Sequence, residues 1–266
     1  MDLSSPNPNL SGPRRRDDPN DFRVSLVLPA WNEEETIQQA IQEATDALSP
    51  LVGDHEIIVV DDGSSDGTRD LLHTLEGQPD LVILYHPANR GKGAALRTGF
   101  PQARGDIVLI QDADLEYDPA DYQRLLAPIL HDQADVVFGS RFKTVEARHT
   151  QPAWHRLGNR ALTCVSNYFT GLRLTDMETC YKVFRREILQ TLTPGLEQEG
   201  FGIEPELTAK VARVGCRIRE VAISYNPRRY HQGKKIGWRD GLFALWCLWR
   251  YRTDAPQTLP DARPAH

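Results

Sequence analysis

The chain has 266 residues, a formal net charge of −6 and a pI of about 5.8. This length fits one large α/β domain, because no linker rich in Pro, Gly or Ser divides the interior. The acidic balance excludes a general nucleic-acid-binding protein, which would carry a basic surface. The four cysteines are widely spaced and form no C-x-x-C pair. This spacing argues against a zinc site or a disulfide framework and fits a reducing cytoplasm.

The two ends of the chain differ in composition from the part between them. Residues 1–21 are rich in proline and charged residues, so they cannot bury enough apolar surface to become ordered. We predict a disordered tail over residues 1–21, a single domain over 22–252 and a second tail over 253–266. No apolar stretch reaches the roughly 20 residues of a membrane-spanning helix, and no signal-peptide core lies near the start. We therefore expect a protein that is not integral to a membrane.

Short apolar runs alternate with segments of helical spacing through the first half of the chain. Buried strands rich in Val and Ile are predicted at residues 24–28, 56–60, 81–85 and 107–110. Helices are predicted between them at residues 34–48, 66–75 and 92–103. This alternation predicts a parallel sheet with helices on both of its faces.

The regular alternation fades in the second half of the chain. Strands are predicted at residues 134–141, 181–184 and 218–225. Helices are predicted at residues 119–130, 154–169 and 204–214, with a final helix beginning near residue 238. The fold class is therefore α/β, with a mostly parallel central sheet.

Polar side chains follow three of the predicted strands. Asp112 and Asp114 follow the strand at 107–110, Asp61 and Asp62 come directly after the strand at 56–60, and Glu33 lies in the segment after the strand at 24–28. In an open parallel sheet, ligands bind outside the carboxyl ends of the strands, so these side chains point toward one crevice. Carboxylate oxygens suit Mg²⁺ or Mn²⁺, which complete their coordination with water and a substrate diphosphate. Aspartate is also common in turns and at helix N-caps, and such structural roles account for the same residues without any bound ligand.

Three segments in this order resemble the family 2 glycosyltransferases. Residues 29–33 resemble their P-x-x-N-E opening, residues 60–68 resemble V-D-D-G-S-x-D-G-T, and residues 112–114 resemble D-x-D. The resemblance spans about residues 23–250. It implies the glycosyltransferase A fold, with a single nucleotide-binding-type domain.

The resemblance also assigns roles to individual residues. The second aspartate of the V-D-D-G-S segment accepts hydrogen bonds from a nucleobase in the family, which gives that role to Asp62. The nucleotide-sugar cleft is assigned to Pro29, Glu33, Asp62, Arg90, Gly91, Lys92 and Asp112. The metal ligands are assigned to Asp112, Asp114 and Glu116, with Mg²⁺ or Mn²⁺ as the cofactor.

A departing nucleoside diphosphate is strongly negative, so the site also needs arginine or lysine side chains. Phosphate and acceptor contacts are predicted for Arg141, Arg160, Arg228 and Lys234, because Arg141 and the basic loop at 227–235 resemble phosphate-binding segments of polyprenyl-phosphate mannosyl- and glucosyltransferases. The catalytic set is predicted to be Asp114, Arg141, Asp176 and Glu178. Asp176 or Glu178 would act as general base for a hydroxyl acceptor, whereas a phosphate monoester needs no strong base.

These expectations describe a metal-dependent, inverting transferase that moves a hexose from a UDP- or GDP-sugar to a polyprenyl- or dolichyl-type lipid phosphate. One alternative is an inverting transferase that acts on a saccharide or another small hydroxyl acceptor. A nucleotidyltransferase would need a glycine-rich loop after the first strand, where residues 29–35 are acidic. An NAD-dependent dehydrogenase is disfavoured because Leu96 stands where the third glycine of the dinucleotide motif belongs. A non-catalytic partner of a membrane complex is disfavoured by the intact Asp112 and Asp114.

The last apolar segment, residues 242–249, contains Trp246 and Trp249 and is flanked by lysines and arginines. A short cationic helix that contains tryptophan is typical of a membrane interface, but a buried C-terminal helix with a basic solvent-exposed rim is the favoured interpretation. We expect a cytoplasmic protein that contacts the inner face of the membrane peripherally or through a membrane-protein partner. Its other expected partners are a nucleotide-sugar donor and a lipid phosphate, with no nucleic acid.

Overall fold

A computed structural model describes residues 18–143, 153–227 and 238–252. In these parts of the chain, seven strands form one sheet in the order β3-β2-β1-β4-β6-β5-β7. The strands are β1 (Arg23–Ala30), β2 (Asp54–Asp61), β3 (Leu81–Tyr85), β4 (Ile107–Ile110), β5 (Val136–Ser140), β6 (Lys182–Arg185) and β7 (Ile218–Ala222). The seven strands predicted from the sequence are all present, and the mostly parallel α/β sheet is confirmed.

One strand runs against the others. β1 pairs in parallel with β2 and β4, and β7 pairs in parallel with β5, but β6 is antiparallel to both β4 and β5. The regular alternation of strands and helices ends before β6. The local sequence of a buried strand does not indicate whether it pairs parallel or antiparallel with its neighbours. The sequence therefore predicts the strand and leaves its direction open.

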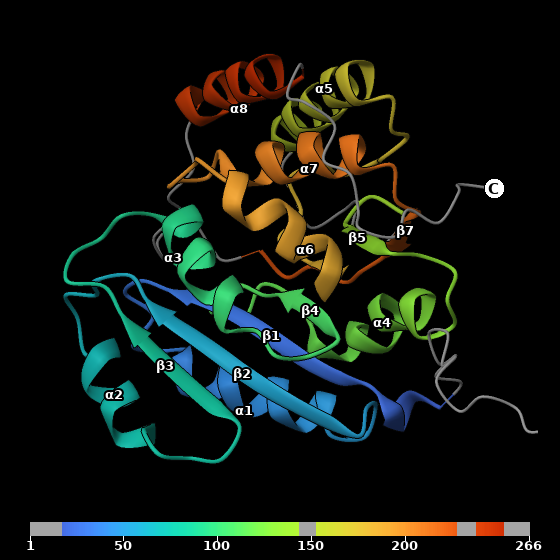
Figure 1. Ribbon diagram of the computed structural model, residues 1–266. Coiled ribbons are helices and arrows are strands. Elements are labelled where there is room, and N and C mark those ends of the chain that lie inside the picture. Colours follow the sequence, from blue (N-terminus) through green and yellow to red (C-terminus); the bar gives the residue numbers. More distant parts are fainter. Residues whose placement is uncertain (1–17, 144–152, 228–237, 253–266) are drawn as a thin grey trace, which may run out of the picture.

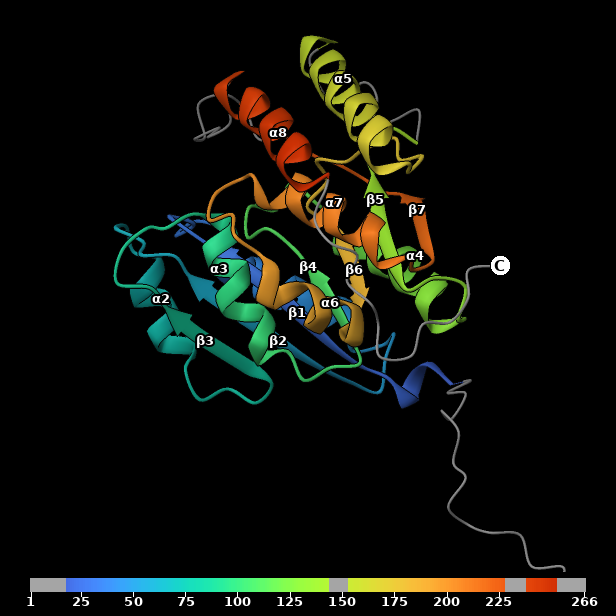
Figure 2. The same ribbon diagram turned by 45° about the horizontal axis from the view of Figure 1, so that its top comes forward.

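Helices cover both faces of the sheet (Figures 1 and 2). They are α1 (Ile37–Leu48), α2 (Thr68–Leu75), α3 (Lys92–Gly99), α4 (Tyr122–Leu130) and α6 (Arg186–Leu192). In Figure 1, α1 and α2 lie behind the sheet, and α3 and α6 lie in front of it. The central strands β1 and β4 are buried along almost their whole length, so the core of the domain lies around them.

Some predicted helix boundaries are wrong by a few residues. The predicted helix at 34–48 begins at Ile37, because residues 32–34 form a loop held by the loop after β2. The predicted helix at 92–103 ends at Gly99 and continues only as a 3₁₀ turn over Phe100–Gln102, where Pro101 has no amide N–H for an α-helical hydrogen bond. Helix α6 has no counterpart among the helices predicted from the sequence.

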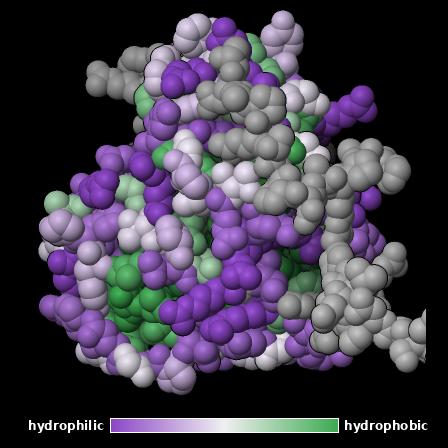
Figure 3. Space-filling view, viewed as in Figure 1, coloured by the Kyte–Doolittle hydropathy of each residue, from purple (hydrophilic) through white to green (hydrophobic). Residues whose placement is uncertain are grey.

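Three further helices, α5 (Ala153–Thr170), α7 (Ile203–Val214) and α8 (Trp238–Tyr251), pack against one another. Figures 1 and 2 show them together at one end of the molecule, away from β2 and β3. No helix in the described parts of the chain is both long and apolar enough to cross a membrane. The face shown in Figure 3 is mostly hydrophilic, with one hydrophobic area toward edge strand β3, whose five residues are all partly exposed.

Candidate active site

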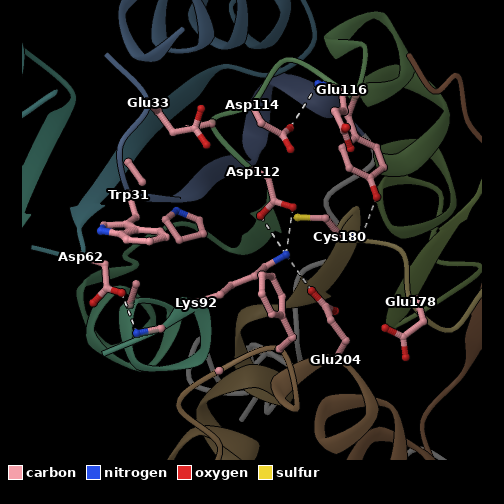
Figure 4. Close-up of a pocket in the computed structure, with 18 of the residues that line it drawn as sticks. Trp31, Glu33, Asp62, Lys92, Asp112, Asp114, Glu116, Glu178, Cys180 and Glu204 are labelled. Atoms are coloured by element: carbon pink, nitrogen blue, oxygen red, sulfur yellow. Dashed lines mark hydrogen bonds and ion pairs between the residues drawn. The ribbon is translucent and has the colours of Figure 1, made fainter. Parts of the chain in front are cut away.

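A pocket of about 410 Å³ opens at the carboxyl ends of β1, β2 and β4. This volume lies within the range of small-molecule sites, roughly 300–1,000 Å³. Figure 4 shows acidic and basic side chains from several elements turned into it. Its walls are formed by Pro29, Ala30, Trp31, Glu33, Asp62, Asn89, Gly91, Lys92, Ala95, Asp112, Ala113, Asp114, Glu116, Tyr117, Arg141, Glu178, Cys180, Gly200, Phe201, Glu204 and Tyr225.

The loops after β1 and β2 hold each other in place. The backbone N–H of Asn32 donates to Ser64 Oγ at 2.9 Å, and Asn32 Oδ1 accepts from the N–H of Ser65 at 2.8 Å. The N–H of Glu33 donates to Thr68 Oγ1 at 2.8 Å. Asn32 has a positive φ of 55°, a conformation that asparagine tolerates better than most residues. Several residues of the two sequence motifs therefore shape the rim of the pocket through contacts with each other.

Asp62 anchors the loop between β3 and α3. Its carboxylate accepts hydrogen bonds from the backbone N–H groups of Arg90 (3.0 Å) and Gly91 (2.6 Å) and from the side chain of Asn89 (2.9 Å). His86 Nδ1 lies 2.6 Å from the same carboxylate. Asp62 is buried on the pocket wall, so it positions this loop beside the space where the predicted nucleotide would bind.

Replacing Asp62 with asparagine is expected to weaken both this loop and nucleotide binding. An amide turns an N–H₂ group toward donors that need an acceptor, and a lost hydrogen bond to a buried carboxylate costs about 1–3 kcal/mol. Calorimetry with UDP and GDP, together with the melting temperature, checks this expectation. Affinities equal to those of the unchanged protein would contradict it, and a changed preference between the two bases would support the predicted contact of Asp62 with the base.

Lys92 links two acidic groups across the pocket. Its Nζ lies 2.8 Å from Asp112 Oδ1 and 2.9 Å from Glu204 Oε1, as Figure 4 shows. Burial alone would lower the pKa of Lys92, but the charges of Asp112 and Glu204 outweigh burial and hold this pKa well above its ordinary value. Glu204 also forms an ion pair with the fully buried Lys182. The pocket therefore contains a fixed ammonium group beside the first aspartate of the D-x-D segment.

The acidic segment after β4 is a tight turn with an unusual backbone. Asp114 Oδ1 accepts a hydrogen bond from the N–H of Glu116 at 3.1 Å, and Leu115 between them has a φ of 56°. Positive φ at a residue with a branched side chain is costly and occurs mostly at functional sites. Glu116 Oε2 accepts a hydrogen bond from the hydroxyl of Tyr225 at 2.6 Å, which fixes the third carboxylate of the segment.

The donor set of this turn fits a hard divalent cation. Asp112, Asp114 and Glu116 all line the pocket and offer only oxygen atoms. Within the described residues, no three His, Cys, Asp or Glu side chains gather closely enough to hold a metal ion by themselves. Magnesium sites commonly use one or two protein carboxylates and take the remaining oxygens from substrate phosphates and water. The residues present therefore fit a metal that would bind together with a diphosphate.

Arg141 and Asp176 form a buried ion pair behind the pocket. The guanidinium donates from Nε to Asp176 Oδ2 at 2.7 Å and from Nη2 to Oδ1 at 2.8 Å, and the backbone N–H of Arg141 adds a third hydrogen bond at 3.0 Å. Asp176 is fully buried and does not line the pocket, whereas Arg141 does. This geometry favours Asp176 as the group that positions Arg141, rather than as a base that reaches an acceptor.

Glu178 differs from the other acidic groups of the pocket. Burial raises the pKa of Glu178 to about 7, and the charge of nearby Glu204 adds to this effect, while Lys182 and Arg141 oppose it. Its Oε1 atom is shielded from solvent and has no hydrogen-bond partner among the described residues. A carboxyl group with this pKa can accept or donate a proton near neutral pH, so Glu178 is the better placed of the two predicted bases.

The structure brings most, but not all, of the predicted site residues together. Arg90 is not part of the pocket wall and forms an exposed ion pair with Glu199 at 2.6 Å. Arg160 is exposed on α5 and also does not line the pocket, so its predicted phosphate contact there is not supported. Arg228 and Lys234 lie outside the described residues. The wall residues without a predicted role include Glu204 and the four aromatic residues Trp31, Tyr117, Phe201 and Tyr225.

Comparison with known proteins agrees with this arrangement. The family model described as glycosyl transferase family 2 matches residues 25–193, which include most of β1, all of β2 to β6 and most of the residues that line the pocket. The chain belongs to glycosyl transferase family 2. The family resemblance stated from the three motifs is therefore confirmed, and so is the assignment of the chain as an enzyme of this family.

Several proteins with assigned names are similar to this chain. A protein from Micrococcus luteus named undecaprenyl-phosphate mannosyltransferase is 30% identical over 221 residues, which cover 81% of this chain and 88% of that protein. Undecaprenyl-phosphate 4-deoxy-4-formamido-L-arabinose transferase of Yersinia pestis is 30% identical, over 80% of this chain and 62% of its own. Glycosyltransferase AglD of Haloferax volcanii is 30% identical over 77% of this chain, which spans only 33% of AglD.

Solved structures of another protein share this fold. Glucosyl-3-phosphoglycerate synthase from Mycobacterium tuberculosis, crystallised with Mn²⁺, UDP and phosphoglyceric acid, superposes with a TM-score of 0.62 at 23% identity. The match covers 91% of this chain and 80% of the synthase. A second structure of that synthase, in complex with UDP, gives a TM-score of 0.63. The expected glycosyltransferase A fold is confirmed.

Proposed function

We propose that this family 2 glycosyltransferase transfers a hexose from a UDP- or GDP-sugar to a polyprenyl-type lipid phosphate, with the aid of Mg²⁺ or Mn²⁺ and with inversion at the anomeric carbon. One observation carries the proposal. A single pocket contains the oxygen ligands Asp112 and Asp114 and the cations Lys92 and Arg141, the combination that a nucleoside diphosphate requires. The names of the Micrococcus and Yersinia relatives support a lipid phosphate as the acceptor.

The side chains of the pocket suit a single displacement. A bound metal would supply charge neutralisation for the diphosphate, and Asp112 and Asp114 would hold it. Lys92 and Arg141 stay cationic in the pocket, so they stabilise the negative charge that develops on the departing diphosphate. An acceptor phosphate oxygen already carries negative charge at neutral pH and attacks the anomeric carbon from the face opposite the leaving group. This attack inverts the anomeric configuration.

The test is a transfer assay with purified protein. UDP- and GDP-hexoses labelled in the sugar are incubated with undecaprenyl phosphate in detergent, with Mg²⁺, with Mn²⁺ or with a chelator. Label is expected in the lipid fraction only when metal is present, and the product should have the inverted anomeric configuration by NMR. Transfer that persists in the chelator would contradict the metal dependence. No label in the lipid fraction with any donor would contradict the lipid acceptor.

A hydroxyl acceptor remains the second candidate, because Glu178 has the properties of a general base. An alcohol must lose a proton as it attacks, and a carboxylate with a pKa near 7 does this efficiently at neutral pH. Removing such a base typically slows a reaction by about 10²–10⁴-fold. Replacing Glu178 with glutamine should therefore abolish transfer to an alcohol but reduce transfer to a phosphate by less than about tenfold.

The same glutamine variant is expected to change the pH dependence of stability. The pKa of Glu178 is raised in the folded protein from its ordinary value of 4.5 to about 7, so folding favours the protonated form. The contribution of protonated Glu178 to the free energy of unfolding is complete below about pH 4.5. It is lost as the pH rises through 7. Glu178→Gln should therefore match the unchanged protein near pH 4 and exceed it at pH 8 by on the order of 2 kcal/mol, allowing for residual solvent exposure. Denaturant unfolding at both pH values measures this, and equal differences at both would contradict it.

A further inference from the structure

Large apolar side chains are exposed in one region of the molecule. Within the described residues, the six that are exposed lie on α5, on α8 or on the loop that precedes α7. They are Leu157 (71% exposed), Tyr168 (84%), Phe201 (37%), Phe243 (44%), Trp246 (47%) and Trp249 (53%). Scattered apolar residues on a protein surface need no explanation, but a concentration in one region marks an interaction site.

The exposed residues form stripes along the two helices. On α5, Leu157, Ala161, Cys164 and Tyr168 follow one another at spacings of three or four residues and are all exposed, so they share one helix face. On α8, the rings of Phe243 and Trp246 stack with centroids 5.5 Å apart. The two helices pack against each other at the end of the molecule farthest from β2 and β3 (Figure 2). We call the exposed side chains Leu157, Tyr168, Phe243, Trp246 and Trp249 the aromatic face.

The charge of these helices is opposite to that of the whole chain. Together α5 and α8 contain four arginines and a single aspartate, although the chain has a net charge of −6. Arg252, directly after α8, lies over the ring of Trp249 at 4.4 Å from its centroid. Aromatic rings interspersed with cations match the interface of an anionic bilayer, where rings enter the headgroup region and arginines meet lipid phosphates. The observations favour such a lipid surface over a protein partner because the charge of the face is complementary to it.

The aromatic face begins at the rim of the pocket. Phe201 lines the pocket and is partly exposed, and Gly202 follows it. A Cβ atom at Gly202 would lie only 2.7 Å from Cε1 of Phe243 and 3.0 Å from Sγ of Cys247, so glycine allows α8 to pack directly beside this rim. A path of apolar side chains therefore leads from the pocket to the exposed rings of α8.

We propose that the aromatic face docks on an anionic lipid bilayer and thereby turns the rim at Phe201 toward the lipid headgroups. This inference rests on the proposed function, because it explains how a lipid phosphate reaches the pocket. The headgroup enters past Phe201 while the hydrocarbon chain stays in the bilayer beside α8. The protein needs no spanning helix for this arrangement, since rings and cations together give peripheral binding.

The test uses the full chain and vesicles that contain no acceptor and no sugar donor. Vesicles with about a third phosphatidylglycerol in phosphatidylcholine are compared with pure phosphatidylcholine by co-sedimentation. The unchanged protein should bind the anionic vesicles at least about tenfold more strongly. Trp246→Ser should weaken this binding about fivefold, and the addition of Leu157→Ser should weaken it further, because each change removes apolar surface from the interface. The control is Val82→Ser on edge strand β3, a partly exposed apolar residue that belongs to neither α5 nor α8, which should leave vesicle binding unchanged.

The outcomes separate this inference from the proposed function. If the unchanged protein ignores anionic vesicles but transfers sugar to polyprenyl phosphate in detergent, docking is overturned and the function stands. If Trp246→Ser and Leu157→Ser leave vesicle binding intact while their melting temperatures stay native, the aromatic face is not the contact. Binding to a membrane protein in place of the lipid surface would likewise overturn the proposal. The proposal is supported if the variants have a raised KM for acceptor in vesicles with an unchanged kcat in detergent.

Discussion

Replacing Asp114 with asparagine is expected to reduce sugar transfer by about three orders of magnitude while the protein stays folded. The amide keeps an oxygen that can accept the hydrogen bond from the N–H of Glu116, so the turn after β4 is preserved. The change removes one negative charge from a pocket wall that already contains the cation Lys92. Without that charge, the pocket holds a divalent cation and its diphosphate poorly. The measurements are kcat/KM, the melting temperature and the metal dependence of UDP and GDP binding.

The matched control for this experiment is Asp118→Asn, four residues further along the chain. Asp118 is exposed, does not line the pocket and accepts a hydrogen bond from the N–H of Ala120 at the start of a 3₁₀ turn. The same chemical change there should leave transfer within about twofold of normal, because it removes only a surface charge. Near-normal transfer by Asp114→Asn would refute the metal site, whatever the behaviour of the control.

Replacing Arg141 with methionine is expected to impair both stability and transfer. Its guanidinium forms two hydrogen bonds to Asp176, which is fully buried. Removing one partner of a buried ion pair leaves an uncompensated charge and typically costs about 3–5 kcal/mol. Arg141 also lines the pocket, so the variant loses a cation from the diphosphate site. Denaturant unfolding and steady-state kinetics measure the two effects.

A double variant separates these two roles of Arg141. Arg141→Met combined with Asp176→Asn removes both charges and keeps an oxygen that can accept from the backbone N–H of residue 141. Most of the lost stability should return, whereas transfer should stay at least about 100-fold below normal. If the double variant regains full activity, the role of Arg141 is structural only and its charge is not needed for transfer.

The strands of this protein could be predicted from the sequence because their burial makes them conspicuous. β1, β2 and β4 each contain a short segment dominated by Val, Ile and Leu, with polar residues at or soon after the end of the strand, and this pattern is visible in the local sequence. The direction of β6 could not be predicted, because it depends on how the chain returns to the sheet after α5. The start of α1 at Ile37 was missed for a related reason, since contacts with Ser64 and Thr68 hold the preceding loop.

The acidic part of the pocket could be predicted because its residues lie at the ends of strands or directly after them. Asp62, Asp112 and Asp114 reach one pocket as the parallel sheet requires. Tyr225 could not be predicted, because it joins Glu116 through a hydrogen bond between residues 109 positions apart in the chain. The pairing of Arg141 with Asp176 is equally non-local, so sequence alone could not tell a catalytic base from a positioning group.

The interlocked loops after β1 and β2 set a rule for exchanging loops between this protein and its relatives. Asn32 and Glu33 form hydrogen bonds with Ser64, Ser65 and Thr68, so neither loop keeps its shape without the other. A chimera that takes residues 29–36 alone from a relative with a different donor would separate these partners and distort both loops. Exchanging residues 29–36 and 61–68 as one cassette preserves every one of these contacts. The unit that can be transplanted with its hydrogen bonds intact is thus a pair of loops about 30 residues apart in the chain.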